Sequence, residues 1–250
     1  MSGLEKTMRR FLVEEIKDGR AVIKGQEALH LSRVLRYEAG ERVLVFDGRG
    51  SLYRSRILAI GPEVLVQIEA EIEAEAENRL EITLAQGLLK GDKMDFVVQK
   101  ATELGAASFV PLTLERSVVK LTDKKAEQRQ ERWQRIAQEA VKQCGRVTVP
   151  DIRPVQSLND LLFAAEDYDL ILFPWEEEQE TSVKAILNEH LNCHKVLCIL
   201  GPEGGMTREE MLAVKKAGGR VVTLGKRILR AETASVAVLS IVQYALGDLG

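Results

Sequence analysis

The 250-residue sequence lacks the long apolar runs and the cysteine pairs that mark membrane and secreted proteins. No stretch approaches the ~20 apolar residues of a transmembrane helix, and residues 11–13 are too short an apolar stretch for the core of a signal peptide. The three cysteines, Cys144, Cys193 and Cys198, contain no CxxC pair, which argues against a disulfide framework and favours a reducing compartment. We therefore predict a cytoplasmic protein without a membrane partner.

Motifs for metals and nucleotides are also missing. His190 and His194 are spaced i, i+4 beside Cys193, but no second ligand pair accompanies them, so we expect an exposed helix end and no metal. No Gly-x-Gly-x-x-Gly follows a predicted strand, and neither a Gly-x-x-x-x-Gly-Lys-Ser/Thr nor a Gly-x-Ser-x-Gly sequence occurs. A P-loop kinase or ATPase is thereby excluded.

An excess of basic residues is absent as well, because 35 lysines and arginines stand against 38 acidic residues and the net charge is −3. No global basic field therefore indicates a nucleic-acid partner. Between Thr113 and Arg146, however, basic residues outnumber acidic ones, and a local basic face can bind phosphates even on an acidic protein. Charge alone favours an ordinary solvated helix face in this segment.

What the sequence does contain is a core-forming composition, with 45% hydrophobic residues, and a β-rich beginning. Segments 20–24, 41–46, 51–60 and 63–72 are short, rich in Val, Ile and Leu, and bounded by Gly, Pro or Asp, which predicts strands. Asp47–Gly50 predicts a hairpin turn between two of them. Five or so strands with one helix indicate a small barrel.

The one helix of this barrel is expected over residues 26–37. Its apolar positions should be buried and its basic positions should face outward. The residues expected to be buried are Leu31, Val34 and Leu35, and those expected to face outward are His30, Arg33 and Arg36.

The end of the barrel is predicted from a change in composition. Residues 69–78 alternate acidic with small apolar side chains, which favours the end of a strand running into a linker. We place the boundary near residue 73, so that the domains are 1–72 and 73–250. The residues before Met8 are interpreted as an upstream extension, with Met8 as the natural start.

The remainder alternates strands with helices, which is typical of an α/β domain with a mainly parallel sheet. Strands are expected at 80–89, 108–114, 169–173, 195–200 and 220–224, and helices at 92–104, 124–144 and 233–246. The second of these helices carries a single apolar stripe that ends at Cys144, so we expect Cys144 in the core.

A glycine-rich loop follows the strand 195–200. Gly201-Pro202-Glu203-Gly204-Gly205 comes directly after the strand, and Thr207 with Glu210 predicts a capping box that opens the next helix. Glycines let a ligand approach bare backbone, and ligands of open α/β sheets bind at the carboxyl ends of the strands. A plain turn rarely needs three glycines and a proline, so we predict a ligand-binding loop.

A second loop, 225–233, is rich in arginine and lysine and leads into 233–246, which contains no charged residue. A helix that is apolar all round must be covered on every side. Its cover is either its own domain or a second subunit. The basic loop is therefore attached to a buried helix, and such a fixed loop suits a binding site.

At these two loops the sequence resembles a known family. Gly201–Gly205 and Leu224–Ala234 resemble the two cofactor motifs of the RsmE-type 16S ribosomal RNA uracil-N3 methyltransferases, which belong to the knotted SPOUT class. Further matches in the same order extend the resemblance over nearly the whole chain from Met8; they are 8–11, 34–36, 90–95, 99–105, 115–117 and 143–146. Met206 stands where this family more usually has Phe.

The resemblance implies a C-terminal trefoil-knot domain that binds S-adenosylmethionine between three loops. It also implies a homodimer formed through the knotted domain, a PUA-like RNA-binding barrel before it, and 16S ribosomal RNA, within the small ribosomal subunit, as substrate. The implied cofactor-binding residues are Leu200, Gly201, Pro202, Glu203, Gly204, Gly205, Leu224, Gly225, Ile228, Leu229, Arg230, Ala231 and Thr233. The expected RNA-binding residues are Arg9, Arg10, His30, Arg33 and Arg36 of the barrel and Arg116 and Arg146 of the catalytic domain.

The implied reaction is methylation at N3 of a uridine, and it suggests two catalytic residues. N3 becomes nucleophilic only as its proton leaves, when negative charge spreads onto O2 and O4. Arg230, in the cofactor loop, is expected to stabilise that charge. Glu232 is a candidate to accept the proton, and an alternative interpretation makes it a structural partner of Arg230. The sulfonium methyl group is already activated, so the reaction requires no metal.

Other interpretations stay open. One is a SPOUT-class 2′-O-ribose RNA methyltransferase, and another is a non-catalytic RNA-binding dimer, which would not need the two cofactor loops. A uracil C5 methyltransferase would need a cysteine nucleophile. The general base, the target nucleotide and the choice between naked RNA and an assembled subunit also stay open.

Overall fold

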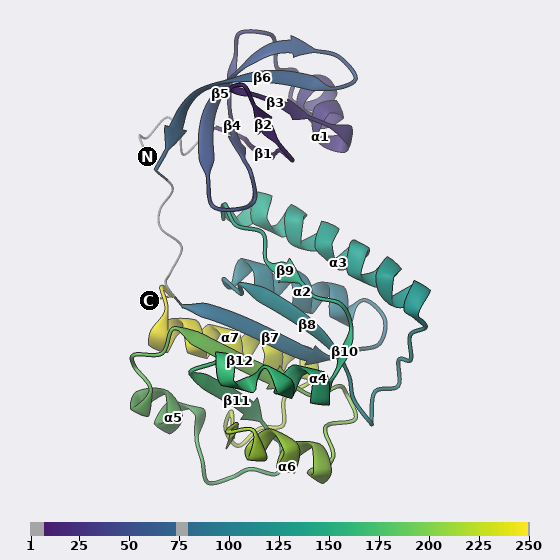
Figure 1. Cartoon of the computed structure of the whole chain (residues 1–250), viewed down its shortest axis with the longest axis vertical. Coiled ribbons are helices and arrows are strands. Elements are labelled where there is room, and N and C mark those ends of the chain that lie inside the picture. Colours follow the sequence, from purple (N-terminus) through teal and green to yellow (C-terminus); the bar gives the residue numbers. More distant parts are fainter. Residues whose placement is uncertain (1–7, 74–79, 250) are drawn as a thin grey trace. The chain divides into compact units, whose positions relative to one another are not determined.

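The computed structural model describes residues 8–73 and 80–249, which group into two compact units (Figure 1). One unit contains the chain through Glu77 together with Val141–Val149, and the other contains Asn78–Ala140 and Pro150–Gly250. The interpreted extension 1–7 and most of the expected linker lie outside the described residues. The domain limits 1–72 and 73–250 stay a prediction.

The N-terminal unit is built on a six-stranded sheet with the order β1-β4-β5-β6-β3-β2. The pairs are antiparallel except β1 with β4. The strands are β1 Arg10–Leu12, β2 Ile16–Lys17, β3 Arg20–Ile23, β4 Arg42–Phe46, β5 Leu52–Ile60 and β6 Val64–Ile72. The four predicted strands are therefore confirmed, as is the hairpin turn, in which the Asp47 carboxylate accepts from the N–H groups of Arg49 and Ser51 at 2.8 and 3.1 Å.

The helix of this unit differs from the prediction. α1 (Gly25–Leu29) continues as a π-helix over His30–Val34, in which the Leu35 N–H donates to the His30 carbonyl at 2.9 Å. This wider turn shifts the helical periodicity, so Val34 is 65% exposed and its predicted burial is wrong. Leu31 is fully buried and Leu35 half-buried; His30, Arg33 and Arg36 are exposed, as predicted.

Alternation along the strands places apolar residues on both faces of this sheet. The inner face forms a core of Val43, Val45, Ile57, Val64 and Val66 against α1 and β1. On the outer face a second cluster joins apolar residues of the hairpin to the end of α3 (Asp123–Cys144) and the segment after it. The buried members of this cluster are Leu44, Phe46, Leu52, Val141 and Val147.

The C-terminal unit is an α/β domain in which every described strand pair is parallel. The sheet order is β10-β8-β7-β12-β11-β13, with β9 paired to β8. The strands are β7 Glu81–Gly87, β8 Ser108–Thr113, β9 Asp151–Ile152, β10 Gln156–Ser157, β11 Leu170–Pro174, β12 Lys195–Leu200 and β13 Arg220–Val222. The short β9 and β10 were not predicted, because two residues carry no periodicity.

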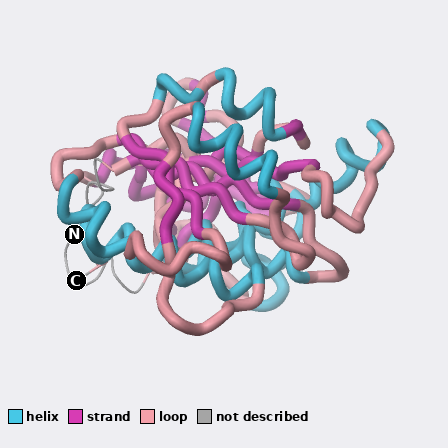
Figure 2. Tube along the Cα trace, turned by 90° about the horizontal axis from the view of Figure 1, so that it is seen from below, coloured by secondary structure: helices cyan, strands magenta, loops and turns pink. Residues whose placement is uncertain are grey.

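Helices cover both faces of this parallel sheet (Figure 2). α7 packs on β7, β12 and α2 on one face, while α4 and α6 bury Leu161 and Val214 against the other. The helices are α2 Lys93–Glu103, α3, α4 Leu158–Phe163, α5 Val183–Glu189, α6 Arg208–Lys216 and α7 Ala231–Leu246. None of the described helices is long and apolar enough to cross a membrane.

Two expectations about helix ends are wrong. α7 begins at Ala231 rather than Thr233, so its first turn contains the charged Glu232, whose carboxylate suits the positive end of a helix dipole. Cys144 is exposed rather than in the core, because it is the last residue of α3. The buried stripe of α3 consists of Trp133, Ala137, Ala140 and Val141.

Candidate active site

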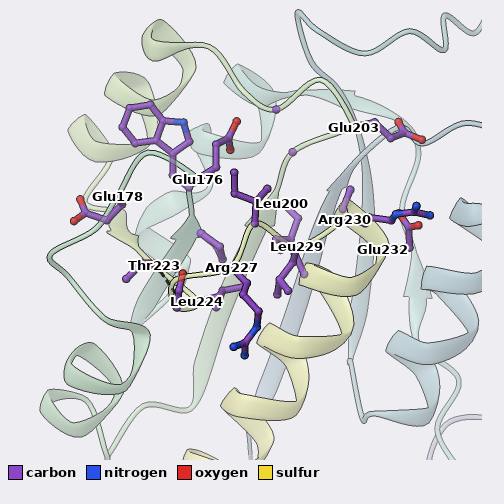
Figure 3. A pocket seen from close by; sticks show the side chains of 18 of the residues that line it. Glu176, Glu178, Leu200, Glu203, Thr223, Leu224, Arg227, Leu229, Arg230 and Glu232 are labelled. Atoms are coloured by element: carbon purple, nitrogen blue, oxygen red, sulfur yellow. Dashed lines mark hydrogen bonds between the residues drawn. The ribbon is translucent and has the colours of Figure 1, made fainter.

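Three loops meet at the carboxyl ends of the adjacent strands β12, β11 and β13. Their residues line one pocket of about 980 Å³, a size within the range of small-molecule and cofactor sites. In Figure 3 the side chains of Leu200 and Leu229 lie in the middle of the site, Glu176 and Glu178 on one side, and Glu203, Arg230 and Glu232 on the other. A pocket at this edge is what parallel α/β sheets provide.

The loop after β12 lies directly against β7. A Cβ atom on Gly87 would come within 2.7 Å of the Pro202 nitrogen and 2.8 Å of its Cδ, so only glycine lets the two backbones approach this closely. The buried Gln86 side chain donates to the Gly201 carbonyl at 2.9 Å and accepts from the Ser235 hydroxyl of α7. Gln86 thus joins the loop after β12 to the helix that follows the loop after β13.

The predicted capping box at the start of α6 is confirmed, and it has a second role. The Glu210 carboxylate accepts from the Thr207 N–H at 2.8 Å and from the Glu115 N–H at 2.9 Å. The next residue, Arg116, donates to the Gly204 and Met206 carbonyls at 3.4 Å. The segment after β8 therefore holds the glycine-rich loop from outside.

The loop after β13 turns at Thr223 and Gly225. The Gly225 N–H donates to the Thr223 hydroxyl at 3.1 Å, and Gly225 has a φ of +118°, which favours glycine. Arg230 is the extended N-cap residue of α7. Residues 223–232 all line the pocket, whereas Thr233, which follows them, does not.

A third loop, after β11, was not singled out from the sequence. Pro174, Trp175, Glu176, Glu178 and Gln179 line the pocket. The Glu178 carboxylate accepts from the N–H groups of Thr181 and Glu180 at 3.0 and 2.8 Å, and these hydrogen bonds hold the pKa of Glu178 below its ordinary value. The sequence feature that could have identified this loop is its position at the carboxyl end of a predicted parallel strand.

Among the cofactor candidates, the structure brings together at the pocket Leu200, Gly201, Pro202, Glu203, Gly205, Leu224, Gly225, Ile228, Leu229, Arg230 and Ala231. Gly204 and Thr233 do not line it. A Cβ atom on Gly204 would lie 3.1 Å from the Arg116 carbonyl oxygen, so this glycine serves the contact with Arg116.

A lysine links two acidic residues at the rim of the pocket. Lys93 Nζ lies 3.3 Å from Glu203 Oε1 and 3.4 Å from Glu232 Oε2. Burial alone would raise the pKa of Glu203, but the Lys90 N–H and the Lys93 ammonium outweigh it and hold that pKa below the ordinary value. Glu232 Oε2 is buried and has no hydrogen-bond partner among the described residues. Glu232 thus pairs with Lys93 and not with Arg230.

The expected RNA-binding residues are placed as follows. Arg9, His30, Arg33 and Arg36 are exposed, whereas Arg10 and Arg146 are half-buried. The Arg10 guanidinium donates to the Gly145 carbonyl. Arg116 is exposed in the C-terminal unit, but Arg146 groups by its contacts with the N-terminal unit and not with the catalytic domain.

Comparison with known proteins agrees with this architecture. Residues 76–243 match the model of the RNA methyltransferase domain, and residues 23–69 match the RNA methyltransferase PUA domain. Ribosomal RNA small subunit methyltransferase E of Bacillus subtilis (strain 168) is 35% identical over 229 residues, which cover 89% of this chain and 89% of the relative. The chain belongs to the ribosomal RNA small subunit methyltransferase E family.

A solved structure supports the membership of the chain in this family. The crystal structure of a ribosomal RNA small subunit methyltransferase E from Neisseria gonorrhoeae bound to S-adenosyl methionine has a TM-score of 0.87 at 33% identity, covering 97% of this chain and 100% of that one. The Aquifex aeolicus (strain VF5) member is 32% identical, covering 94% of this chain and 98% of the relative. The predicted fold class, a PUA-like domain before an α/β methyltransferase domain, is confirmed.

Proposed function

We propose that this chain transfers a methyl group from S-adenosylmethionine to N3 of a specific uridine in the 16S ribosomal RNA of the small subunit. The observation that carries the proposal is the pocket formed by three loops, together with a structural relative of the same family that is bound to S-adenosyl methionine. S-adenosylmethionine would supply an activated methyl group. The protein has to supply alignment and charge stabilisation.

The residues at the pocket fit such a cofactor. Leu200, Leu224 and Leu229 offer apolar surface, and Gly201 and Gly225 expose backbone beside it. Gly205 has a φ of +71°, which favours glycine, and a Cβ atom there would meet the Glu176 carboxylate, so these two loops lie close together at the pocket. The Trp175 Nε1 is buried and has no hydrogen-bond partner among the described residues. Such an N–H group suits a hydrogen bond to an acceptor atom of a bound ligand.

The reacting atom determines what the protein must do. The N3 nitrogen of uracil carries a proton between two carbonyls, and negative charge spreads onto O2 and O4 as the proton leaves. Arg230 lines the pocket and has a permanent positive charge that would stabilise this anion. Methylation of a ribose hydroxyl would develop charge on a single oxygen instead.

Glu232 would accept the N3 proton, directly or through a water molecule. Its side chain is 17% exposed, and its Oε2 is buried and makes no hydrogen bond among the described residues, so the hydrogen-bonding capacity of this oxygen is not used up. Lys93, at 3.4 Å, would orient the carboxylate. The pairing with Lys93 favours this role over a structural pairing of Glu232 with Arg230.

Substrate binding and assembly complete the proposal. The PUA-like domain, taken as residues 1–72, would bind ribosomal RNA, and residues 73–250 would form the knotted catalytic domain and pair two chains into a homodimer. The exposed Arg9, Arg33 and Arg36 support the first role. The cytoplasmic location inferred from the sequence stays a prediction.

The decisive experiment maps the modified nucleoside. Small ribosomal subunits that lack the modification are incubated with the protein and labelled S-adenosylmethionine, and the RNA is digested to nucleosides. We expect 3-methyluridine from the parent and little product from Arg230→Ala, which should still bind the cofactor. A methyl group on ribose O2′ or on uracil C5 would refute the proposal, and an absence of cofactor binding would favour a non-catalytic RNA-binding protein.

A further inference from the structure

A row of cationic side chains crosses the outer face of the N-terminal sheet. Strand register pairs Lys17 of β2 with Arg20 of β3, Arg20 with Gln67 of β6, Gln67 with Arg56 of β5, and Arg56 with Arg42 of β4. Directly opposed residues of antiparallel strands point to the same face. The row therefore spans five neighbouring strands, which at the usual interstrand spacing is about 19 Å.

The row lies on the uncovered part of its face. Leu44 follows Arg42 by two residues in β4, so both point to the same side of the sheet. Leu44 is buried in the cluster with Val141 and Val147, whereas Arg42 and Arg56 are exposed. One half of the outer face is thus apolar and covered, and the other half is cationic and open.

A β-bulge arranges the arginine-rich end of the row. In β6, Ile68 pairs with Ser55 and Ala70 with Arg54, which leaves Glu69 as the extra residue. Its carboxylate accepts from Arg42 Nε at 2.9 Å and from Arg56 Nε at 2.7 Å, and Arg54 Nε lies 3.9 Å away. Three guanidinium groups thus gather around the Glu69 carboxylate.

This arrangement is unfavourable for the sheet by itself. Like charges directly opposite one another destabilise an antiparallel pair, and the row contains two such pairs, Lys17 with Arg20 and Arg42 with Arg56. Glu69 offsets the second pair, whereas within the described part of the chain Arg20 has a single side-chain hydrogen bond, to the Gln67 amide oxygen at 3.4 Å. A row of oriented guanidinium groups on an open face is, in turn, what binds a phosphate backbone.

We infer that Lys17, Arg20, Arg42 and Arg56 form a phosphate-binding surface that holds the backbone of the substrate RNA. The inference rests on the proposed function, because it takes ribosomal RNA as the ligand. This surface is separate from the helix surface of His30, Arg33 and Arg36. It positions the RNA and does not read its bases.

The test uses the double variant Lys17→Gln/Arg20→Gln in the full-length protein, because neither residue contacts Glu69. Binding to small ribosomal subunits is measured over a range of salt concentrations. We expect Kd to rise about threefold to tenfold and the slope of log K against log salt to become shallower by about 1.4, at about 0.7 per lost contact with a single-stranded backbone. Cofactor affinity should not change.

Two controls make the test specific. Lys184→Gln/Lys216→Gln removes the same charge from exposed positions of α5 and α6 and should leave both the affinity and the slope at the parent values. Lys17→Arg/Arg20→Lys keeps the charge and should bind as the parent does. If Lys17→Gln/Arg20→Gln binds with the affinity and slope of the parent, the surface is refuted while the proposed function stands. If the parent itself does not bind ribosomal subunits, both are refuted.

Discussion

At the scale of single residues, the geometry of the pocket depends on a few close contacts of the loop backbones. Gly87 lets the backbone of Pro202 touch β7, Gly205 admits the Glu176 carboxylate, and the Gln86 amide joins the Gly201 carbonyl to Ser235. These contacts determine where the loop backbone lies. They are local, and each can be broken without changing the composition of the core.

Gly87→Ala adds only a methyl group, but we expect it to lower the stability of the fold and to weaken cofactor binding. The new methyl group would lie 2.7–2.8 Å from the Pro202 nitrogen and Cδ and from Leu114 Cδ1, and backbone cannot move aside as a flexible side chain can. We expect a loss of about 1–3 kcal/mol in the free energy of unfolding, typical of overpacking, and weaker S-adenosylmethionine binding by calorimetry.

Gly218→Ala is the matched control for this substitution. Gly218 also lies in the C-terminal unit, has a φ of +87° and would have no atom within 4 Å of a new Cβ. It should lose stability through backbone strain alone and bind the cofactor as the parent does. Equal cofactor affinity in Gly87→Ala and the parent would show that the contact with Pro202 does not position the loop.

Glu232→Gln tests the acceptor of the N3 proton. Glutamine keeps the shape of the side chain but cannot take up a proton, so turnover at neutral pH should fall by about a hundredfold or more. As the pH rises, more of the uridine loses its N3 proton without help, and the deficit should shrink. The ratio of parent to variant rates is measured across the pH range with saturating cofactor. A ratio that does not change with pH would assign Glu232 a structural role.

At the scale of elements, the periodicity of apolar residues predicted the long and regular helices and strands. The strand 195–200 and the helices α2 and α3 were predicted to within a residue or so, because their apolar residues recur over several turns or fill a buried strand. The π-helix at His30–Val34 was not predictable, since its wider turn leaves no mark in the pattern. The loop after β11 was missed because its acidic residues resemble a solvated turn.

The loop after β11 contains a tryptophan, so ligand binding can be tested by fluorescence. Trp175 lines the pocket and its Nε1 has no hydrogen-bond partner within the described residues, whereas Trp133 is 1% exposed and donates to Asp95 at 3.2 Å. These are the two tryptophans of the chain. Titration with S-adenosylmethionine should change the tryptophan emission of the parent and of Trp133→Phe, but not that of Trp175→Phe. A response that disappears in Trp133→Phe instead would place the ligand elsewhere.

At the scale of the whole molecule, the order of elements gave the two-part organisation before any contact was known. Which segments belong to which unit was harder to predict from the sequence. Val141–Val149 joins the N-terminal unit because Val141 and Val147 pack on Leu44 and Phe46. Such a contact links residues about a hundred positions apart and has no local signal. The cofactor residues were identified by resemblance to family motifs, since periodicity cannot indicate a ligand.

The exposed side of α7 bears on whether the chain forms a dimer. Val238, Leu239 and Val242 are buried within the chain, but Tyr244 is 75% exposed. Val236, Ala237, Ser240 and Ile241 are half-buried, and together with Tyr244 they follow helical spacing along one side. Of the two covers considered for this helix, its own domain alone is therefore insufficient, and a largely apolar stripe is left for a partner.

We predict that this stripe is buried between two copies of the chain. Sedimentation at low micromolar concentration should give about twice the 27.9 kDa of one chain. Ile241→Glu is tolerable in a single chain, because the position is half-exposed, but in a dimer it would desolvate a carboxylate without a partner and should yield monomers. Leu212→Glu, on the 52% exposed Leu212 of α6, is the control and should remain dimeric. A 27.9 kDa parent, or an Ile241→Glu variant that still dimerises, would rule out dimerisation through this face of α7.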